Sequence, residues 1–136
     1  MLVCDTSGLI AFFDASDAAH QRVSTAVERS GGPFVVSPYV VAEVDYLLAT
    51  RRGVAAELAA LRELAGGAWD LADFGADDLG EATNVVERYQ DQNIGVADAS
   101  LVILAARYRT DRVLTLDHRH FTVLRTQSGK PFSLLP

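Results

Sequence analysis

Short apolar runs alternate along this chain with longer stretches whose apolar residues recur at helical spacing. The runs predict buried strands over residues 2–4, 34–36, 69–72 and 113–116. The longer stretches predict helices over residues 9–13, 18–30, 38–48, 54–65, 77–89 and 96–105. This alternation is typical of an α/β fold, and we expect a three-layer sandwich in which helices cover both faces of a mostly parallel central sheet.

Small and capping residues mark several predicted element ends. Gly31 is expected to end the second helix in a left-handed turn. Ser37 and Pro38 have the residue types favoured at the N-cap and the first position of the helix that follows them. The C-terminal part is less regular, and residues 121–124 and 132–135 predict short strand or edge structure around a polar turn.

Length and composition indicate one domain that spans residues 1–136. The chain has 136 residues, of which 49% are hydrophobic, and this suits a single core. No apolar run approaches the roughly 20 residues of a membrane span, and no basic leader precedes an apolar stretch at the start. We therefore expect a cytoplasmic protein. The single cysteine, Cys4, lies in an apolar run and is expected to pack as a small buried hydrophobe.

Carboxylates occupy positions where a parallel sheet gathers its functional groups. Asp5 and Asp117 each follow a predicted strand, and Asp98 lies in the first turn of a predicted helix. Ligands of open parallel sheets bind beyond the carboxyl ends of the strands, so these three acids are expected to converge. Each of them taken singly has a simpler explanation, because aspartate commonly caps a helix or lies in its first turn.

The net charge of −6 argues against a basic surface for nucleic-acid binding. This objection weakens if several acids share a divalent cation, because the ion neutralises them locally and offers phosphate a positive centre. Acids that crowd at one edge of a sheet would otherwise repel one another.

The helix over residues 38–48 offers two further acids. Glu43 lies at one border of its apolar stripe, and Asp45 lies about as far off at the other border. Periodicity alone therefore does not choose between them.

The whole pattern resembles the PIN-domain family. Four motifs occur in order along almost the entire chain: Asp5-Thr6-Ser7-Gly8-Leu9-Ile10, Ser37-Pro38 followed by Ala42-Glu43, Ala97-Asp98-Ala99-Ser100, and Leu114-Thr115-Leu116-Asp117 with Phe121 after it. Chain length and the run from Asp117 to Phe121 look most like the VapC-type toxins of bacterial toxin-antitoxin pairs. A single short motif would be weak, but four in order are specific.

This resemblance implies a PIN-like fold and a metal-dependent endoribonuclease. Asp5, Glu43, Asp98 and Asp117 would hold one or two Mg²⁺ or Mn²⁺ ions, so the resemblance selects Glu43 over Asp45. It also implies RNA as the substrate, a small cognate antitoxin as a partner, and pairing of the chain with itself. The apolar surface of residues 40–48 is a candidate contact for the antitoxin.

Neighbouring polar residues have supporting or unrelated roles in this interpretation. Thr6, Ser7 and Thr115 are expected to orient a carboxylate or a water molecule, although helix capping is an equal alternative for Thr6 and Ser7. His118 and His120 lack the spacing of a zinc motif, and we expect surface or phosphate-contact roles for them.

Three other functions compete with the toxin. A solitary RNA-processing nuclease of the same family would have the same site. A phosphatase with Asp5 as nucleophile would pass through an aspartyl-phosphate, but it normally has a second aspartate two residues later, where this chain has Ser7. A non-catalytic binding module would use its acids only as helix caps and would show no dependence on divalent ions.

Overall fold

Five parallel strands form the centre of the molecule. The computed structural model describes residues 1–136. The strands are β1 (Leu2–Cys4), β2 (Phe34–Val36), β3 (Asp70–Leu71), β4 (Arg112–Leu114) and β5 (Ser133–Leu135). Their order in the sheet is β3-β2-β1-β4-β5, and every neighbouring pair is parallel. The predicted α/β class with a parallel sheet is confirmed.

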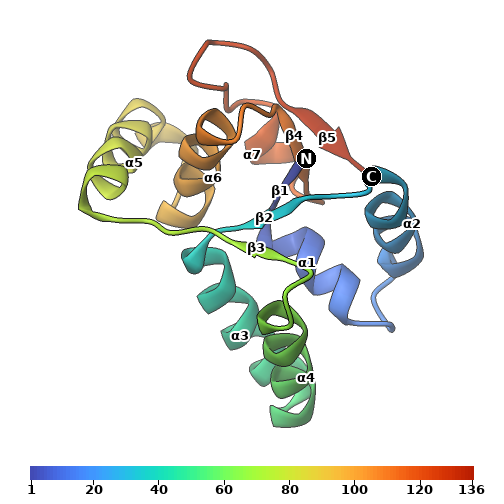
Figure 1. Ribbon diagram of the computed structural model, residues 1–136. Helices are drawn as coiled ribbons and strands as arrows, with labels where there is room; N and C mark the ends of the chain where they lie inside the picture. The colour runs from blue at the N-terminus through green and yellow to red at the C-terminus, as the bar shows by residue number, and fades with distance from the viewer.

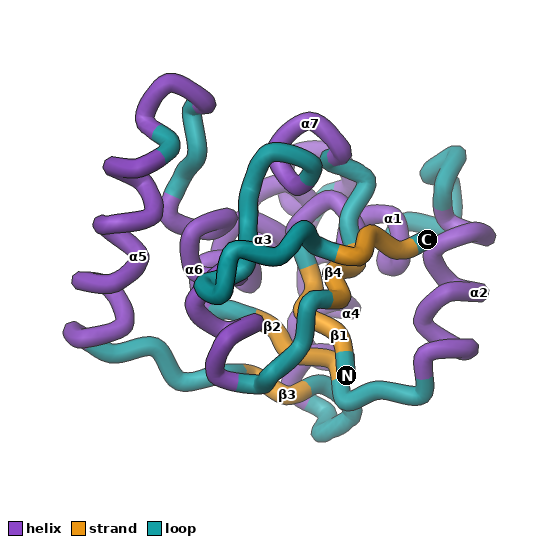
Figure 2. The backbone as a smooth tube through the Cα atoms, turned by 90° about the horizontal axis from the view of Figure 1, so that it is seen from above, coloured by secondary structure: helices purple, strands orange, loops and turns teal.

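Helices cover both faces of this sheet. They are α1 (Thr6–Phe13), α2 (His20–Ser30), α3 (Pro38–Arg52), α4 (Val54–Ala65), α5 (Ala76–Arg88), α6 (Val96–Arg107) and the single turn α7 (His118–Phe121), with a 3₁₀ turn, η1 (Gln90–Gln92), before α6. In Figure 1, α5 and α6 lie above the sheet, and α1, α3 and α4 lie below it. Figure 2 shows the same molecule from above, with α5 and α2 on opposite sides of the strands. None of these helices is long and apolar enough to span a membrane.

Capping residues set the element ends much as predicted. Gly31 ends α2 with φ of 69°, in the left-handed region. Ser37 caps α3 by accepting a hydrogen bond from the backbone N–H of Tyr39, and Pro38 is its first residue. The predicted strands over residues 69–72 and 113–116 are shorter, because β3 contains Asp70–Leu71 and β4 ends at Leu114.

One predicted element is wrong. Residues 121–124 were expected to form strand or edge structure, but Phe121 ends α7 and the chain then makes a turn. Phe121 and Leu124 are both buried, whereas Thr122 and Val123 are exposed. This spacing of three residues is helical, so the apolar pair packs inward from consecutive turns of the chain. The strand predicted over 132–135 is confirmed as β5.

The core is continuous from the sheet to the helices, with 33 buried apolar residues. All three residues of β1 are fully buried, as expected for a central parallel strand. Cys4 is among them, and burial raises the pKa of its thiol, so the prediction of an inert, structural cysteine agrees with its surroundings.

Gly8 of α1 lies directly against the end of β4. A Cβ atom at this position would lie 2.7 Å from the carbonyl oxygen of Leu114 and 2.8 Å from the Cγ of the same residue. The first of these is a backbone atom of β4, so relief requires movement of a whole element. Gly8 therefore permits the contact between the start of α1 and the end of β4.

Replacing Gly8 with alanine is expected to lower the free energy of unfolding by about 1–3 kcal/mol, the usual range for overpacking. The matched control is Gly80→Ala in α5, where an added Cβ meets nothing within 4 Å. That change should stabilise the protein by about 0.5–1 kcal/mol, because alanine favours a helix interior. Urea unfolding of both variants measures the two effects, and equal stabilities would contradict this packing argument.

Candidate metal centre

The four predicted acids line one cavity at the carboxyl ends of the strands. The cavity has a volume of about 820 Å³, and Asp5, Glu43, Asp98 and Asp117 line it together with a fifth acid, Asp17. Asp5 directly follows β1, Glu43 lies in α3, Asp98 lies in the first turn of α6, and Asp117 precedes α7. The strand order reverses at β1, because β2 lies on one side of it and β4 on the other, so the cavity occupies the usual ligand position of such sheets.

Asp5 is the most buried of these acids, with 4% of its surface exposed. The hydroxyls of Ser7 and Thr115 each donate a hydrogen bond of 2.8 Å to its Oδ2 atom. Ser7 Oγ also accepts from the backbone N–H of Leu116, and Thr115 Oγ1 accepts from that of Asp117, both at 2.9 Å. These bonds fix the Asp5 carboxylate and join the start of α1 to the segment after β4.

Glu43 reaches the same cavity from α3. The hydroxyl of Thr6 donates a hydrogen bond of 2.7 Å to Glu43 Oε1, which links α3 to the first residue of α1. Asp45 is absent from the cavity lining and lies beside Glu57 of α4 instead. The hydrogen bond between these two carboxyl groups raises the pKa of Glu57. The structure thus places Glu43, and not Asp45, with the other acids.

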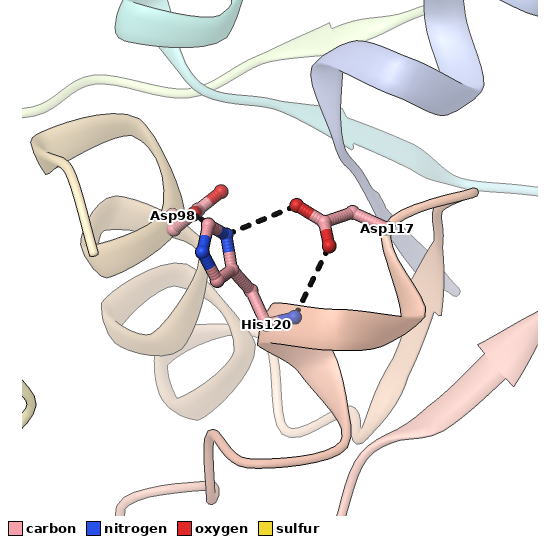
Figure 3. A group of neighbouring side chains, drawn as sticks. All are labelled: Asp98, Asp117 and His120. Atoms are coloured by element: carbon pink, nitrogen blue, oxygen red, sulfur yellow. Dashed lines mark hydrogen bonds and ion pairs between the residues drawn. The ribbon is translucent and has the colours of Figure 1, made fainter. Parts of the chain in front are cut away.

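Asp98 and Asp117 meet around a histidine. Figure 3 shows the imidazole ring of His120 between the two carboxyl groups. Its Nδ1 atom lies 3.0 Å from Asp98 Oδ2 and 3.0 Å from Asp117 Oδ2. The other oxygen of Asp117, Oδ1, accepts a hydrogen bond of 3.1 Å from the backbone N–H of His120. This last bond caps α7 and holds the three side chains in one group.

A buried serine pair connects the two helices that supply Glu43 and Asp98. The Ser100 hydroxyl in α6 lies 2.7 Å from Ser37 Oγ at the start of α3, and 2.6 Å from the carbonyl oxygen of Ala97. Neither serine is exposed to solvent. Because buried hydroxyls need partners, this pair fixes how α3 and α6 approach each other and so sets the spacing of the site.

Burial, together with the charges of neighbouring acids, raises the pKa of two carboxyl groups of the site. Burial raises the pKa of Asp98 to about 7, and the negative charges of Asp5, Asp117 and Glu43 add to this, while the charge of His120 opposes it. Burial also raises the pKa of Asp5, and the hydrogen bonds from Thr115 and Ser7 offset only part of that rise. A nearby cation favours the charged form of such carboxyl groups and lowers their pKa values again.

The donor atoms of the site suit a hard divalent ion. Oxygen ligands from several carboxylates are what Mg²⁺ and Mn²⁺ prefer, and sulfur ligands are absent from the cavity. Asp98, Asp117 and His120 each offer one ligand atom, and these atoms all lie within 4.8 Å of one another. His120 Nδ1 is also the one buried side-chain nitrogen or oxygen that has no hydrogen-bond partner. A cation among these groups would satisfy that atom and reduce the repulsion between the acids.

Most of the predicted site residues meet, and one further group joins them. The cavity lining includes all four predicted acids together with Thr6 and Ser7, while Thr115 lies buried behind Asp5. Capping explains Asp117 in part, but Asp5 makes no capping hydrogen bond with its side chain. His120 was expected at the surface or on phosphate, yet it lies inside the acidic cluster.

A parallel α/β sandwich with clustered acids at its switch point defines the class of PIN domains, and a family model of the PIN domain matches residues 2–125. The chain belongs to this family. Over 99% of its length it is 56% identical to the whole of "Ribonuclease VapC26" from Mycobacterium tuberculosis, which places it with the VapC ribonucleases.

A solved structure agrees with this fold. The crystal structure of Mycobacterium tuberculosis VapC20, described as a sarcin-ricin-loop-cleaving toxin, superposes with a TM-score of 0.79. The match covers 88% of this chain and 93% of that one, at 20% sequence identity. At this identity the match supports the fold alone.

Proposed function

We propose that this protein is an Mg²⁺- or Mn²⁺-dependent endoribonuclease and the toxin of a VapBC-type toxin-antitoxin pair. The observation that carries the proposal is the convergence of four carboxylates from β1, α3, α6 and the segment after β4 on one cavity. The sequence relationship to a VapC ribonuclease supports the same chemistry.

The proposed reaction is hydrolysis of an RNA phosphodiester bond. Asp5, Glu43, Asp98 and Asp117 would hold one or two divalent ions, which supply activation of water and neutralisation of charge on the phosphate. Ser7 and Thr115 keep the Asp5 carboxylate in one orientation, and Thr6 does the same for Glu43. Because backbone N–H groups hold the Ser7 and Thr115 hydroxyls in place, the Asp5 carboxylate needs little rearrangement when an ion binds.

The cavity offers one strong candidate for a contact with the RNA backbone. Arg51 is the only arginine or lysine that lines it. The next residue, Arg52, instead forms an ion pair of 2.9 Å with Asp14, and Arg107 forms one of 2.8 Å with Asp78. The positive charge of Arg51 would therefore face the substrate in an otherwise acidic cavity.

The proposed protein partners are a cognate antitoxin and a second copy of this chain. Tyr46 on α3 has 68% of its surface exposed, and Ala42, Tyr46 and Leu47 form a small apolar pocket beside Glu43. An antitoxin segment bound there would extend directly into the acidic cavity. A short reading frame for a DNA-binding protein next to the gene would favour a toxin over a solitary nuclease.

The proposed substrate is cellular RNA, so we expect the protein to act in the cytoplasm.

Removal of divalent ions is expected to abolish cleavage. The native protein, incubated with a labelled single-stranded RNA, should cut it in Mg²⁺ or Mn²⁺, lose this activity in excess EDTA, and regain it when either ion is restored in excess. Gel analysis of the fragments measures the reaction.

Protein purified in parallel with Asp5→Asn controls for contaminating ribonuclease. Cleavage by the native protein that persists in EDTA, and that the Asp5→Asn preparation does not show, would refute a metal-dependent enzyme. A folded native protein that leaves all RNA substrates intact in both ions would favour a non-catalytic binding module.

A further inference from the structure

The Nδ1 atom of His120 occupies an unusual position. It lies 3.0 Å from one carboxylate oxygen of Asp98 and 3.0 Å from one of Asp117, yet it is buried and makes no hydrogen bond of acceptable geometry. Buried polar atoms are nearly always hydrogen-bonded or bound to a metal. The neighbouring His118, on the same short helix, is exposed and outside the cavity.

The spacing of these atoms matches that of ligands on one ion. Two adjacent ligands of an octahedral ion with bonds of roughly 2.1 Å lie about 3.0 Å apart. His120 Nδ1 has this separation from both carboxylate oxygens. A hydrogen bond of the ring to either carboxylate alone would need a turn toward that partner, whereas an ion between the three atoms would satisfy all of them in place.

We propose that His120 binds the divalent ion directly through Nδ1, together with Asp98 and Asp117. This inference rests on the proposed metal-dependent function and adds a nitrogen ligand to a site otherwise made of carboxylates. Imidazole binds Mn²⁺ more readily than Mg²⁺, which strongly prefers oxygen ligands and retains its waters. The mixed ligand set therefore makes this protein select Mn²⁺ over Mg²⁺.

Electron spin-echo spectroscopy of the Mn²⁺-loaded protein tests the ligand directly, because a coordinated imidazole nitrogen modulates the echo. The chain has three histidines. Besides His118 and His120 there is His20, whose Nδ1 lies 2.8 Å from the carbonyl oxygen of Ala11. We expect nitrogen modulation in the native protein and in His118→Gln, and its loss in His120→Gln. Absence of modulation in the native protein, or its persistence in His120→Gln, overturns the proposal.

Calorimetric titration gives a second readout that does not depend on catalysis. His120→Gln should weaken Mn²⁺ binding about tenfold or more, a loss typical of disturbed metal sites, and should weaken Mg²⁺ binding by about threefold or less, because water replaces the lost ligand. His118→Gln should change neither affinity. An equal loss for both ions in His120→Gln, with unchanged thermal unfolding, would mean that the histidine only positions the carboxylates, and the proposal would fail.

These outcomes also separate the ligand from the enzyme. If nitrogen modulation is present but the loaded protein cleaves no RNA, the ribonuclease assignment fails and the histidine ligand stands. If metal-dependent cleavage occurs without nitrogen modulation, only the histidine ligand fails. If Mn²⁺ does not bind the folded native protein at all, both proposals fail.

Discussion

The Asp5→Asn variant is expected to cleave RNA about 10²- to 10³-fold more slowly than the native protein, a loss comparable to removing one group that stabilises transition-state charge. Asparagine has nearly the same shape, and its amide oxygen still accepts hydrogen bonds from Ser7 and Thr115. The change therefore removes the negative charge with little disturbance of the packing. Single-turnover cleavage of a labelled RNA in Mg²⁺ or Mn²⁺ measures the rate.

Two controls distinguish this loss of catalysis from a folding defect: the melting temperature of Asp5→Asn, and the activity of a variant at an acid outside the cavity. Burial raises the pKa of Asp5, so the neutral side chain should leave the melting temperature in EDTA unchanged or higher. Asp45→Asn, which neutralises an acid of α3 outside the cavity, should leave cleavage unchanged. Native-like cleavage by Asp5→Asn, or an equal loss in Asp45→Asn, would remove the four-acid site as the source of activity.

Local rules were sufficient to predict the acids that follow strands. Asp5 comes directly after the fully buried strand β1, and Asp117 comes soon after β4, which pairs with β1. In a parallel sheet such positions share one edge, so their convergence follows from the topology. Glu43 required more, because its helix presents two acids at equivalent borders of the apolar stripe. The motif resemblance selected Glu43, and the structure distinguishes it by its place in the cavity lining and its hydrogen bond from Thr6.

His120 was missed because no element was predicted over residues 118–120, which lie between the predicted strands 113–116 and 121–124. Without a periodicity to assign, neither His118 nor His120 could be placed on the cavity side. In the short helix that forms, His120 lies three residues after Asp117 and therefore shares its face. Two features of the sequence do indicate the short helix. Asp117 is a residue type favoured at an N-cap, and Phe121 and Leu124 have helical spacing.

The Asp98→Asn variant is expected to be more stable than the native protein in EDTA at neutral pH. The pKa of Asp98 is raised to about 7 in the folded protein, from an ordinary value of 3.8. Between these values the unfolded chain loses its proton while the folded protein keeps it, so the native protein loses stability as pH rises from about 4 to 7. Asparagine has no proton to lose and avoids this cost, whose upper bound is about 4 kcal/mol.

Saturating Mn²⁺ should make the native protein more stable than Asp98→Asn. The ion binds the carboxylates of the folded native protein and stabilises the folded state by mass action, whereas Asp98→Asn has lost a ligand. Thermal unfolding from pH 5 to 8.5, with EDTA and with Mn²⁺, measures both effects.

Asp78→Asn is the matched control. Hydrogen bonds from Gly75 and Arg107 lower the pKa of Asp78, so the stabilisation that its carboxylate gives is present above pH 4 and is lost in acid. That variant should be less stable than the native protein at neutral pH, with or without Mn²⁺. A native protein that is more stable than Asp98→Asn in EDTA at pH 8 would show that repulsion among the acids does not destabilise the empty site.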